Sequence, residues 1–221
     1  MTTTPAPSTT PVTPAAAPAS FELSTALGPP LEPWVLEGAV VRLEPLVRAH
    51  EEALAEAARP QEIWENSLGP RRREEVLPYI ERALADRAAG TGCPFAVRHL
   101  AEGRIIGATR FHSYRREHRS IEIGYTWYHP SYWRTAVNTE CKLLLLTVAF
   151  ERLGCIRVQF RVSVHNKRSR AAVARLGAVE EGTLRAEWLL PDGRRRDMTY
   201  YSILDHEWPA VKARLAARLR P

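Results

Sequence analysis

Two hydrophobic periods run through the middle of the chain. Over residues 156–164 (IRVQFRVSV) apolar and polar residues alternate strictly, which predicts a strand with one face on a core. Residues 139–153 are apolar nearly all round, which predicts a helix buried against a sheet, and Gly154 follows as its natural stop. The pattern therefore predicts strands and helices that pack on one another within one unit.

Similar patterns fill the rest of the chain from about residue 34. Strands are expected at 40–43, 94–100, 104–112, 120–129, 156–164, 188–190 and 197–204, and helices at 48–59, 72–89, 139–153, 166–176 and 206–219. The order βααβββαβαββ predicts the α/β (α+β) class, a mixed, mostly antiparallel sheet with helices on both faces.

The strand expected at 120–129 alternates in character, so its side chains should divide between two faces. One face should carry Glu122, Gly124, Thr126 and Tyr128, and the other Ile121, Ile123, Tyr125 and Trp127. This strand delivers a loop, 130–138, onto the start of the apolar helix. The first N–H groups of a helix lack partners and favour negative charge, so the layout predicts an anion site.

A second helix start follows one βα unit later, after His165-Asn166-Lys167. Asn166 is a good residue for a helix N-cap. Two helix starts at this separation suit a ligand that has a pyrophosphate and a long thin arm.

Residues 1–33 are expected to form a disordered Thr/Pro/Ala-rich tail, because residues 1–20 hold no charged side chain. We expect one domain over 34–221. The tail lacks the basic start and apolar block of a signal peptide, and the run 143–146 is far too short to span a bilayer. A soluble, cytoplasmic protein without membrane contact is expected.

Cysteine usage and charge narrow the chemistry. Cys93, Cys141 and Cys155 make neither a disulfide framework nor a metal cluster, so reduced thiols and no metal are expected. The net charge is +6, and the 28 arginines and 3 lysines are scattered. This disfavours nucleic-acid binding, and Arg194–Arg196 beside Asp192-Gly193 fit an exposed hairpin tip.

Two segments, IEIGYTWYHPSYWRTAVNTECKLLLL and VHNKRSRAAVARLGAVEEGTLR, carry a resemblance to a known family. Residues 34–205 resemble the GNAT superfamily of N-acetyltransferases, in particular its RimJ/RimL-like branch. The resemblance implies the GNAT fold, in which two central strands splay apart and admit the arm of acetyl-CoA. It also implies direct transfer of an acetyl group from acetyl-CoA to a primary amine.

The resemblance also implies a cofactor site. The main chain of Ile123, Tyr125 and Trp127 would hold the pantetheine arm. The pyrophosphate would lie on Arg134, Thr135, Ala136, Val137, Asn138 and Thr139, and the second helix would contribute Asn166 and Ser169. This chain departs from the family loop, because Ala136 stands where glycine is usual and no glycine occurs between Gly124 and Gly154.

The transfer needs a neutral amine and a proton for the leaving thiolate. Glu122 is the candidate base and His112 the second choice. Many family members use a tyrosine in the second helix as the acid, but Val173 occupies that position here. Ser169 is the expected substitute, with Tyr125 or Tyr128 in reserve.

The acceptor stays open between a protein N-terminal α-amine and a small amine such as a polyamine or an aminoglycoside. Residues 64–68, the early helices and the hairpin around 185–200 should shape its site. The glycine-free loop and Val173 leave a second hypothesis, a non-catalytic acyl-CoA-binding or sensing module. A homodimer is compatible with the sequence.

Overall fold

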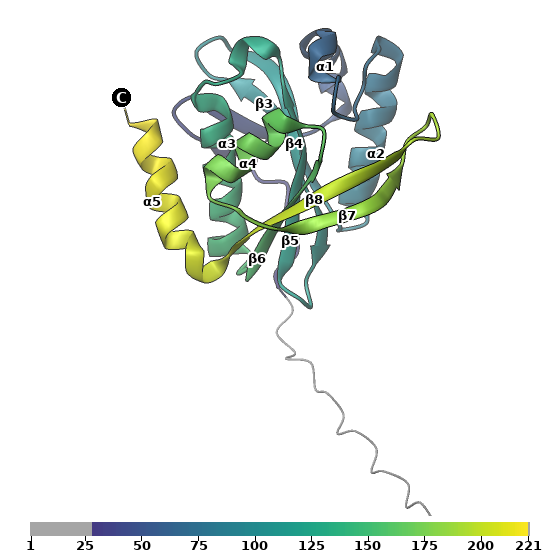
Figure 1. Cartoon of the computed structure of the whole chain (residues 1–221). Coiled ribbons are helices and arrows are strands. Elements are labelled where there is room, and N and C mark those ends of the chain that lie inside the picture. The colour runs from purple at the N-terminus through teal and green to yellow at the C-terminus, as the bar shows by residue number, and fades with distance from the viewer. Residues whose placement is uncertain (1–27, 221) are drawn as a thin grey trace, which may run out of the picture.

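The computed structural model describes residues 28–220. In this part of the chain eight strands form one sheet in the order β1-β2-β3-β4-β5-β6-β8-β7 (Figure 1). Neighbouring strands are antiparallel except for β5 and β6, which are parallel. The expected mixed, mostly antiparallel sheet is confirmed.

The strands are β1 Leu36–Glu37, β2 Val41–Pro45, β3 Cys93–His99, β4 Arg104–Arg115, β5 Ser120–Tyr128, β6 Arg157–Ser163, β7 Val179–Leu189 and β8 Arg195–Leu204. The α-helices are α1 Glu51–Ala58, α2 Val76–Ala88, α3 Ala136–Thr147, α4 Lys167–Leu176 and α5 Trp208–Leu219. The sequence pattern did not predict β1 or most of β7. Strand β1 has only two residues, and β7 is exposed along most of its length, so neither has an alternating buried face.

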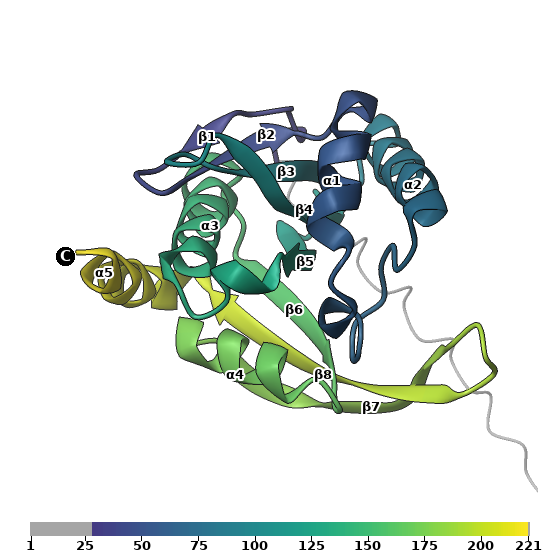
Figure 2. The same cartoon turned by 90° about the horizontal axis from the view of Figure 1, so that it is seen from above.

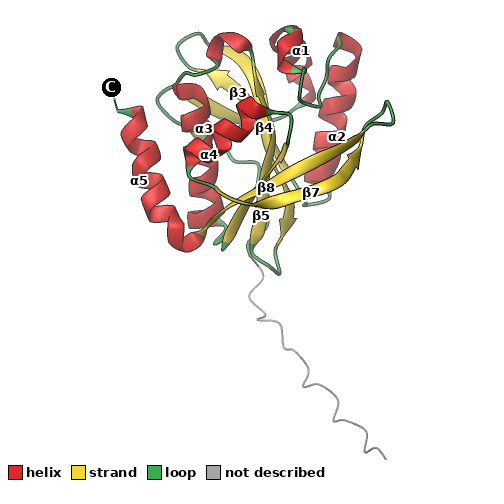
Figure 3. Cartoon of the chain, viewed as in Figure 1, coloured by secondary structure: helices red, strands yellow, loops and turns green. Residues whose placement is uncertain are grey.

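Helices cover both faces of the sheet (Figures 2 and 3). Helices α1 and α2 pack on one face in a cluster that contains Leu54, Ile80 and Trp127. Helices α3, α4 and α5 contribute to the core on the other face, which contains Phe111, Ile121 and Leu145. We call these the α1/α2 face and the α3 face.

A bulge in β5 overturns the simple alternation expected for 120–129. Ala108 of β4 pairs with Trp127 and Arg110 pairs with Gly124, so β5 has one residue more than β4 between the two pairs. Tyr125 absorbs the extra residue with a φ of 50°. Beyond the bulge the faces exchange, and Tyr128 joins the α3 core while Trp127 joins the α1/α2 core.

Helix α3 is tied to the sheet by a buried carboxylate. The Glu140 side chain accepts hydrogen bonds from the backbone N–H groups of Ala39 (2.8 Å), Val40 (2.7 Å) and Val41 (2.8 Å). These bonds fix the rotation of α3 about its axis, because only one flank of the helix can face the start of β2.

Residues 1–27 of the expected tail lie outside the described residues. Residues just after them contact the domain, since Gly28 N donates to Arg116 O and the Tyr114 hydroxyl donates to Pro29 O. Within 28–220, no helix is both long and apolar enough to cross a membrane.

Candidate active site

The central strands β5 and β6 separate part-way along their length. Their parallel pairing covers Ser120↔Arg157, Ile121↔Val158 and Glu122↔Gln159 and ends there. The rest of β5 has no pairing with β6, whose other edge stays bonded to β8 as far as Ser163. This leaves main-chain groups of β5 free to bond a ligand, as expected for a splayed strand pair.

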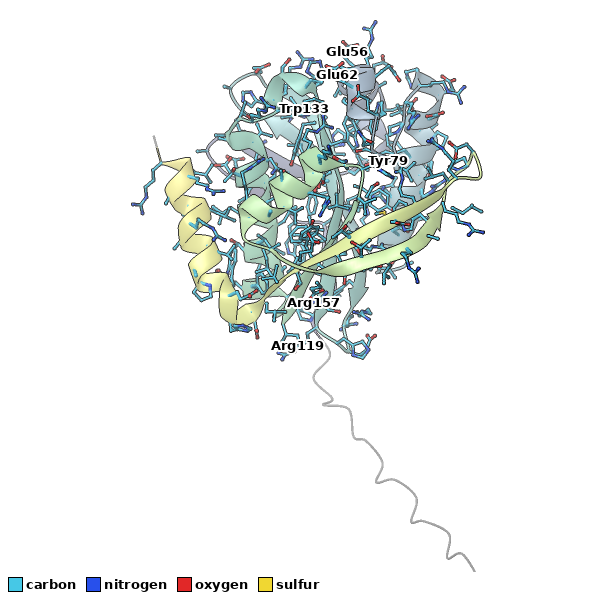
Figure 4. The ribbon with its side chains drawn as sticks, viewed as in Figure 1. Glu56, Glu62, Tyr79, Arg119, Trp133 and Arg157 are labelled. Atoms are coloured by element: carbon cyan, nitrogen blue, oxygen red, sulfur yellow. The ribbon has the colours of Figure 1, made fainter. Side chains whose placement is uncertain are left out.

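The opening points toward the ends of the strands that carry the candidate loops. Figure 4 places Trp133 and Glu62 at this end of the molecule, and Arg119 and Arg157 at the paired end. Helices α3 and α4 both begin near the open end (Figure 2). The two helix N-termini expected from the sequence therefore flank one opening.

At the first of these helix starts, Thr135 is the N-cap of α3. Its Oγ1 accepts a hydrogen bond from Val137 N at 3.3 Å and donates one to Tyr132 O at 2.8 Å. Arg134 is exposed and has a φ of 62°, a conformation that usually requires glycine. The cap satisfies one N–H group of the first turn and leaves the others as anion donors.

Asn166 caps α4, as expected, and also contacts another element. Its Oδ1 accepts from Ser169 N at 2.9 Å, and its Nδ2 donates to Ser67 Oγ at 3.1 Å. Ser67 belongs to the segment between α1 and α2, so that segment is held against the start of α4. Val173 is buried in the core, and Ser169 lies partly exposed in the first turn.

A cation–π contact links the two helix starts. The Arg168 guanidinium of α4 lies 3.6 Å from the centre of the Trp133 ring, whose Nε1 donates to Tyr128 O at 3.0 Å. Burial lowers the pKa of Arg168, while the charges of Glu65 and Glu62 oppose that shift. Both carboxylates therefore lie near the same end of the opening.

On the α1/α2 face, Glu122 stands at the point where the strands separate, 4% exposed. Arg161 Nε lies 2.9 Å from Oε1 and 2.8 Å from Oε2, and Gln159 Nε2 donates to Oε2 at 3.1 Å. The His112 imidazole Nε2 lies 3.3 Å from Oε1. Both carboxylate oxygens therefore have donors.

Electrostatics keep this carboxylate ionised. Burial alone would raise the pKa of Glu122, but the hydrogen bonds and charges of His112 and Arg161 outweigh it and lower the pKa. Arg161 also contacts Glu187 Oε1 at 3.2 Å, and Tyr200 donates to the same oxygen. We call Glu122, His112, Arg161, Glu187 and Tyr200 the Glu122 network.

The three β5 residues expected to hold a cofactor arm send their side chains in different directions. Ile123 is buried in the α3 core, and Trp127 packs against Trp64 with ring centres 5.2 Å apart. Tyr125 is 40% exposed and lies under the Arg110 guanidinium, 3.7 Å from its ring centre. Their main chain still forms the unpaired edge of β5.

Sequence reasoning missed Arg161, Glu187 and Lys142. Arg161 lies on the polar side of the alternating strand, beside Gln159, and that phase was a usable signal. Glu187 gave none, because β7 shows no alternation. Lys142 was hidden in an apolar run, yet its Nζ donates to Thr126 Oγ1 at 2.7 Å on the α3 face.

Comparison with known proteins now adds to this geometry. Residues 41–179, well over half of the chain, match the family described as "Acetyltransferase (GNAT) domain". The chain belongs to the GNAT acetyltransferase family. It is an N-acetyltransferase, and the expected recognition and fold are confirmed.

GNAT relatives occur among both curated proteins and solved structures. YdaF of Bacillus subtilis, provisionally named a ribosomal N-acetyltransferase, is 34% identical over 140 residues, which cover 63% of this chain and 73% of YdaF. A GCN5-related N-acetyltransferase from Brucella melitensis is 30% identical, with a TM-score of 0.81 and 90% of each chain covered.

The RimJ structure of Mycobacterium smegmatis, in complex with CoA-disulfide, has a TM-score of 0.71. It is 23% identical and covers 84% of this chain and 95% of RimJ. At that identity it supports the shared GNAT fold alone.

Proposed function

We propose that this GNAT protein transfers an acetyl group directly from acetyl-CoA to a primary amine, with a protein N-terminal α-amine as the first candidate acceptor. The observation that carries the proposal is the end of β5–β6 pairing at Glu122↔Gln159, with the starts of α3 and α4 on either side of the opening. The provisional name of YdaF, which is 34% identical to this chain, supports a ribosomal-protein acceptor.

The residues present fit acetyl-CoA. The free edge of β5 supplies N–H and C=O groups for the amides of the arm. The first turn of α3 and the exposed Arg134 supply donors and charge for a pyrophosphate. Acetyl-CoA, when bound, supplies the acetyl group as an activated thioester. Asn166 and Ser169 would face it from α4.

The amine would reach the opening from the α1/α2 face. The segment between α1 and α2 lies near the β7–β8 hairpin. Burial and the charge of Arg194 lower the pKa of Arg196 in that hairpin, and the charge of Arg71 from the segment adds to this. The Glu122 network would lie between them, beneath the bound amine. We expect these two segments to select the acceptor.

The Glu122 network would remove the proton from the amine. A carboxylate whose pKa is lowered is a weak base alone, and histidine is the side chain used most often as a general base. We therefore assign this role to Glu122 together with His112, in which the carboxylate orients the imidazole. Ser169 is partly exposed in the first turn of α4, and its hydroxyl would donate a hydrogen bond to the sulfur.

The test is a thiol-release screen of the full chain with acetyl-CoA and a panel of amines. The panel contains peptides with free N-termini, the same peptides with blocked N-termini, a polyamine and an aminoglycoside. Release of CoA thiol with free but not blocked peptides is expected. Absence of both acetyl-CoA binding and turnover with every amine would overturn the proposal.

One observation supports the alternative of a non-catalytic acyl-CoA-binding module. Val173 occupies the position in α4 where many family members have the tyrosine that acts as the acid. Similarity to acetyltransferases favours the enzyme. Calorimetry that finds tight acetyl-CoA binding, combined with no transfer in the screen, would favour the module instead.

A further inference from the structure

Helix α3 carries a buried amino group that none of the roles above uses. Lys142 is 5% exposed. Its Nζ donates to Thr126 Oγ1 at 2.7 Å, and that hydroxyl also shares a 2.8 Å hydrogen bond with Thr109 Oγ1. An ammonium has three N–H donors, and within residues 28–220 Thr126 is the one hydrogen-bond acceptor that Nζ contacts.

The orientation of α3 turns Lys142 toward β5. Glu140 points to the start of β2, where it binds three backbone N–H groups. Two positions further along, a side chain projects roughly 200° around the helix, that is, from the opposite flank. On that flank Lys142 reaches Thr126, directly after the β5 bulge and on the strand edge that β6 has left.

Residue choice at this position is unusual for the chain. Only 3 of its 31 Lys and Arg residues are lysines, and the other two, Lys167 and Lys212, are not buried. Arginine stays charged in proteins, whereas lysine can release its proton when buried. Burial lowers the pKa of Lys142 to about 8. A thiol has a pKa of about 8.5, so the two groups are matched for proton exchange.

We propose that Lys142 is the catalytic acid that protonates the departing CoA thiolate, an assignment that rests on the proposed function. As the N–C bond to the acetyl carbon forms, the C–S bond breaks and its electron pair stays on sulfur. Lys142 then transfers a proton from Nζ to that sulfur. The amine releases its proton on the other side of the sheet to the Glu122–His112 pair, which passes it on to water, and Lys142 regains a proton from water.

This assignment fills the gap that Val173 leaves. Ser169 has a hydroxyl that can donate a hydrogen bond but is too weak an acid to be the proton source alone. Helices α3 and α4 lie on the same side of the sheet, one on each side of the place where β5 and β6 separate (Figure 2). Lys142 on α3 and Ser169 on α4 therefore belong to the two helices that flank this place.

The first test measures the thiol of bound CoA, without turnover. CoA is bound to wild-type protein, Lys142→Met and the matched control Lys212→Met, and the ultraviolet absorbance of its thiolate is titrated. Burial raises the pKa of Cys93, Cys141 and Cys155 to about 12, so the protein's own thiols stay silent. A nearby ammonium favours the thiolate.

We expect the pKa of the bound thiol to be lower by about one unit in wild type and Lys212→Met than in Lys142→Met, a tenfold change in the ionisation constant. Equal values in all three proteins would overturn the assignment. If Lys142→Met does not fold, Lys142→Gln takes its place. The wild type alone also tests the assignment, because a bound CoA thiol with the same pKa as that of free CoA would overturn it.

The second test separates an acid from a structural residue. With an acceptor from the screen, Lys142→Met should lower kcat by about 100-fold near neutral pH while KM for acetyl-CoA changes little. The ratio of wild-type to variant kcat should narrow above about pH 9, because wild-type Lys142 is then deprotonated. Cys141 is the titratable side chain beside Lys142, and burial raises the pKa of its thiol to about 12.

A ratio that does not change with pH, or a variant as active as wild type, would overturn the role of Lys142 and leave the acetyltransferase proposal standing. Absence of CoA binding and of turnover in the wild type would instead overturn the acetyltransferase proposal itself.

Discussion

The two faces of β5 hold buried charged groups in opposite circumstances. On the α1/α2 face, Glu122 has donors on both oxygens from His112, Gln159 and Arg161. On the α3 face, Lys142 has one neutral acceptor, Thr126. A compensated buried charge supports the fold, whereas an uncompensated one costs stability and is retained for another reason. The difference separates a charge-compensated network, the proposed proton acceptor, from a candidate proton donor.

The largest expected effect comes from removing the compensated charge. Glu122→Ala leaves the partly buried Arg161 and the buried His112 without their shared partner, so it should lower the free energy of unfolding by about 3 kcal/mol. Urea denaturation at neutral pH measures it. Glu81→Ala is the control, because Glu81 forms an exposed pair with Arg48 and its loss should leave the midpoint unchanged. A similar midpoint shift in both variants would contradict the comparison.

Removing the uncompensated charge should have the opposite sign. Burial lowers the pKa of Lys142 from 10.5 to about 8, which corresponds to about 3 kcal/mol at most. Lys142→Met should therefore be more stable than wild type near pH 7. Loss of the hydrogen bond between Lys142 and Thr126 reduces this gain. Between about pH 8 and 10.5 Lys142 is protonated in the unfolded chain but not in the folded one. The free energy of unfolding of the wild type therefore rises toward that of Lys142→Met as the pH increases from about 8 to 10.5.

Unfolding free energies at neutral and alkaline pH check this prediction, with Lys212→Met as the control. A Lys142→Met protein that is less stable than wild type at both pH values would show that the lysine is structural.

The close approach of β5 to His112 gives a third prediction. A Cβ atom on Gly124 would lie 2.5 Å from His112 Nε2, so Gly124→Ala must displace the imidazole from Glu122. We expect a loss of about 1–3 kcal/mol. In a His112→Ala background the same change should cost less, because the clash is gone. Equal costs in both backgrounds would mean that His112 is not the obstacle.

Acid should reveal the Glu122 network through a smaller effect. The pKa of Glu122 is lowered in the folded protein, so its contribution is present at neutral pH and is lost as the pH falls through the folded-state pKa. Wild-type unfolding free energy should therefore fall on acidification more steeply than that of Glu122→Gln. If the free energies of unfolding of the two proteins fall equally with pH, protonation of Glu122 does not contribute to acid denaturation.

The smallest effect is expected at the mouth of the opening. Arg168→Ala removes the cation–π contact with Trp133, which should cost about 0.5–1 kcal/mol and change the tryptophan fluorescence. Arg175→Ala, on the same helix and exposed, is the control. An unchanged emission spectrum in Arg168→Ala would argue against the stacked contact in solution.

Much of the fold follows from local patterns. The alternation over 156–164 correctly predicted β6. The apolar run 139–153 and Gly154 predicted most of α3 and its π-helical extension Val148–Arg152. Asn166 was found as a cap from residue type alone. Helix ends moved by a few residues, because capping groups such as Thr135 decide them. The site-residue roles, the boundary near residue 34, the cytoplasmic location and a homodimer stay predictions.

The sequence by itself determined which segments become strands and helices, since periodicity and caps act within a few residues. Only the tertiary structure decided which groups meet. The bulge at Tyr125 exchanges the faces of Trp127 and Tyr128, and strand pairing brings Arg161 to Glu122. The anchoring of Glu140 turns Lys142 onto Thr126 of β5. Such contacts join residues distant in the chain, and no local period encodes them.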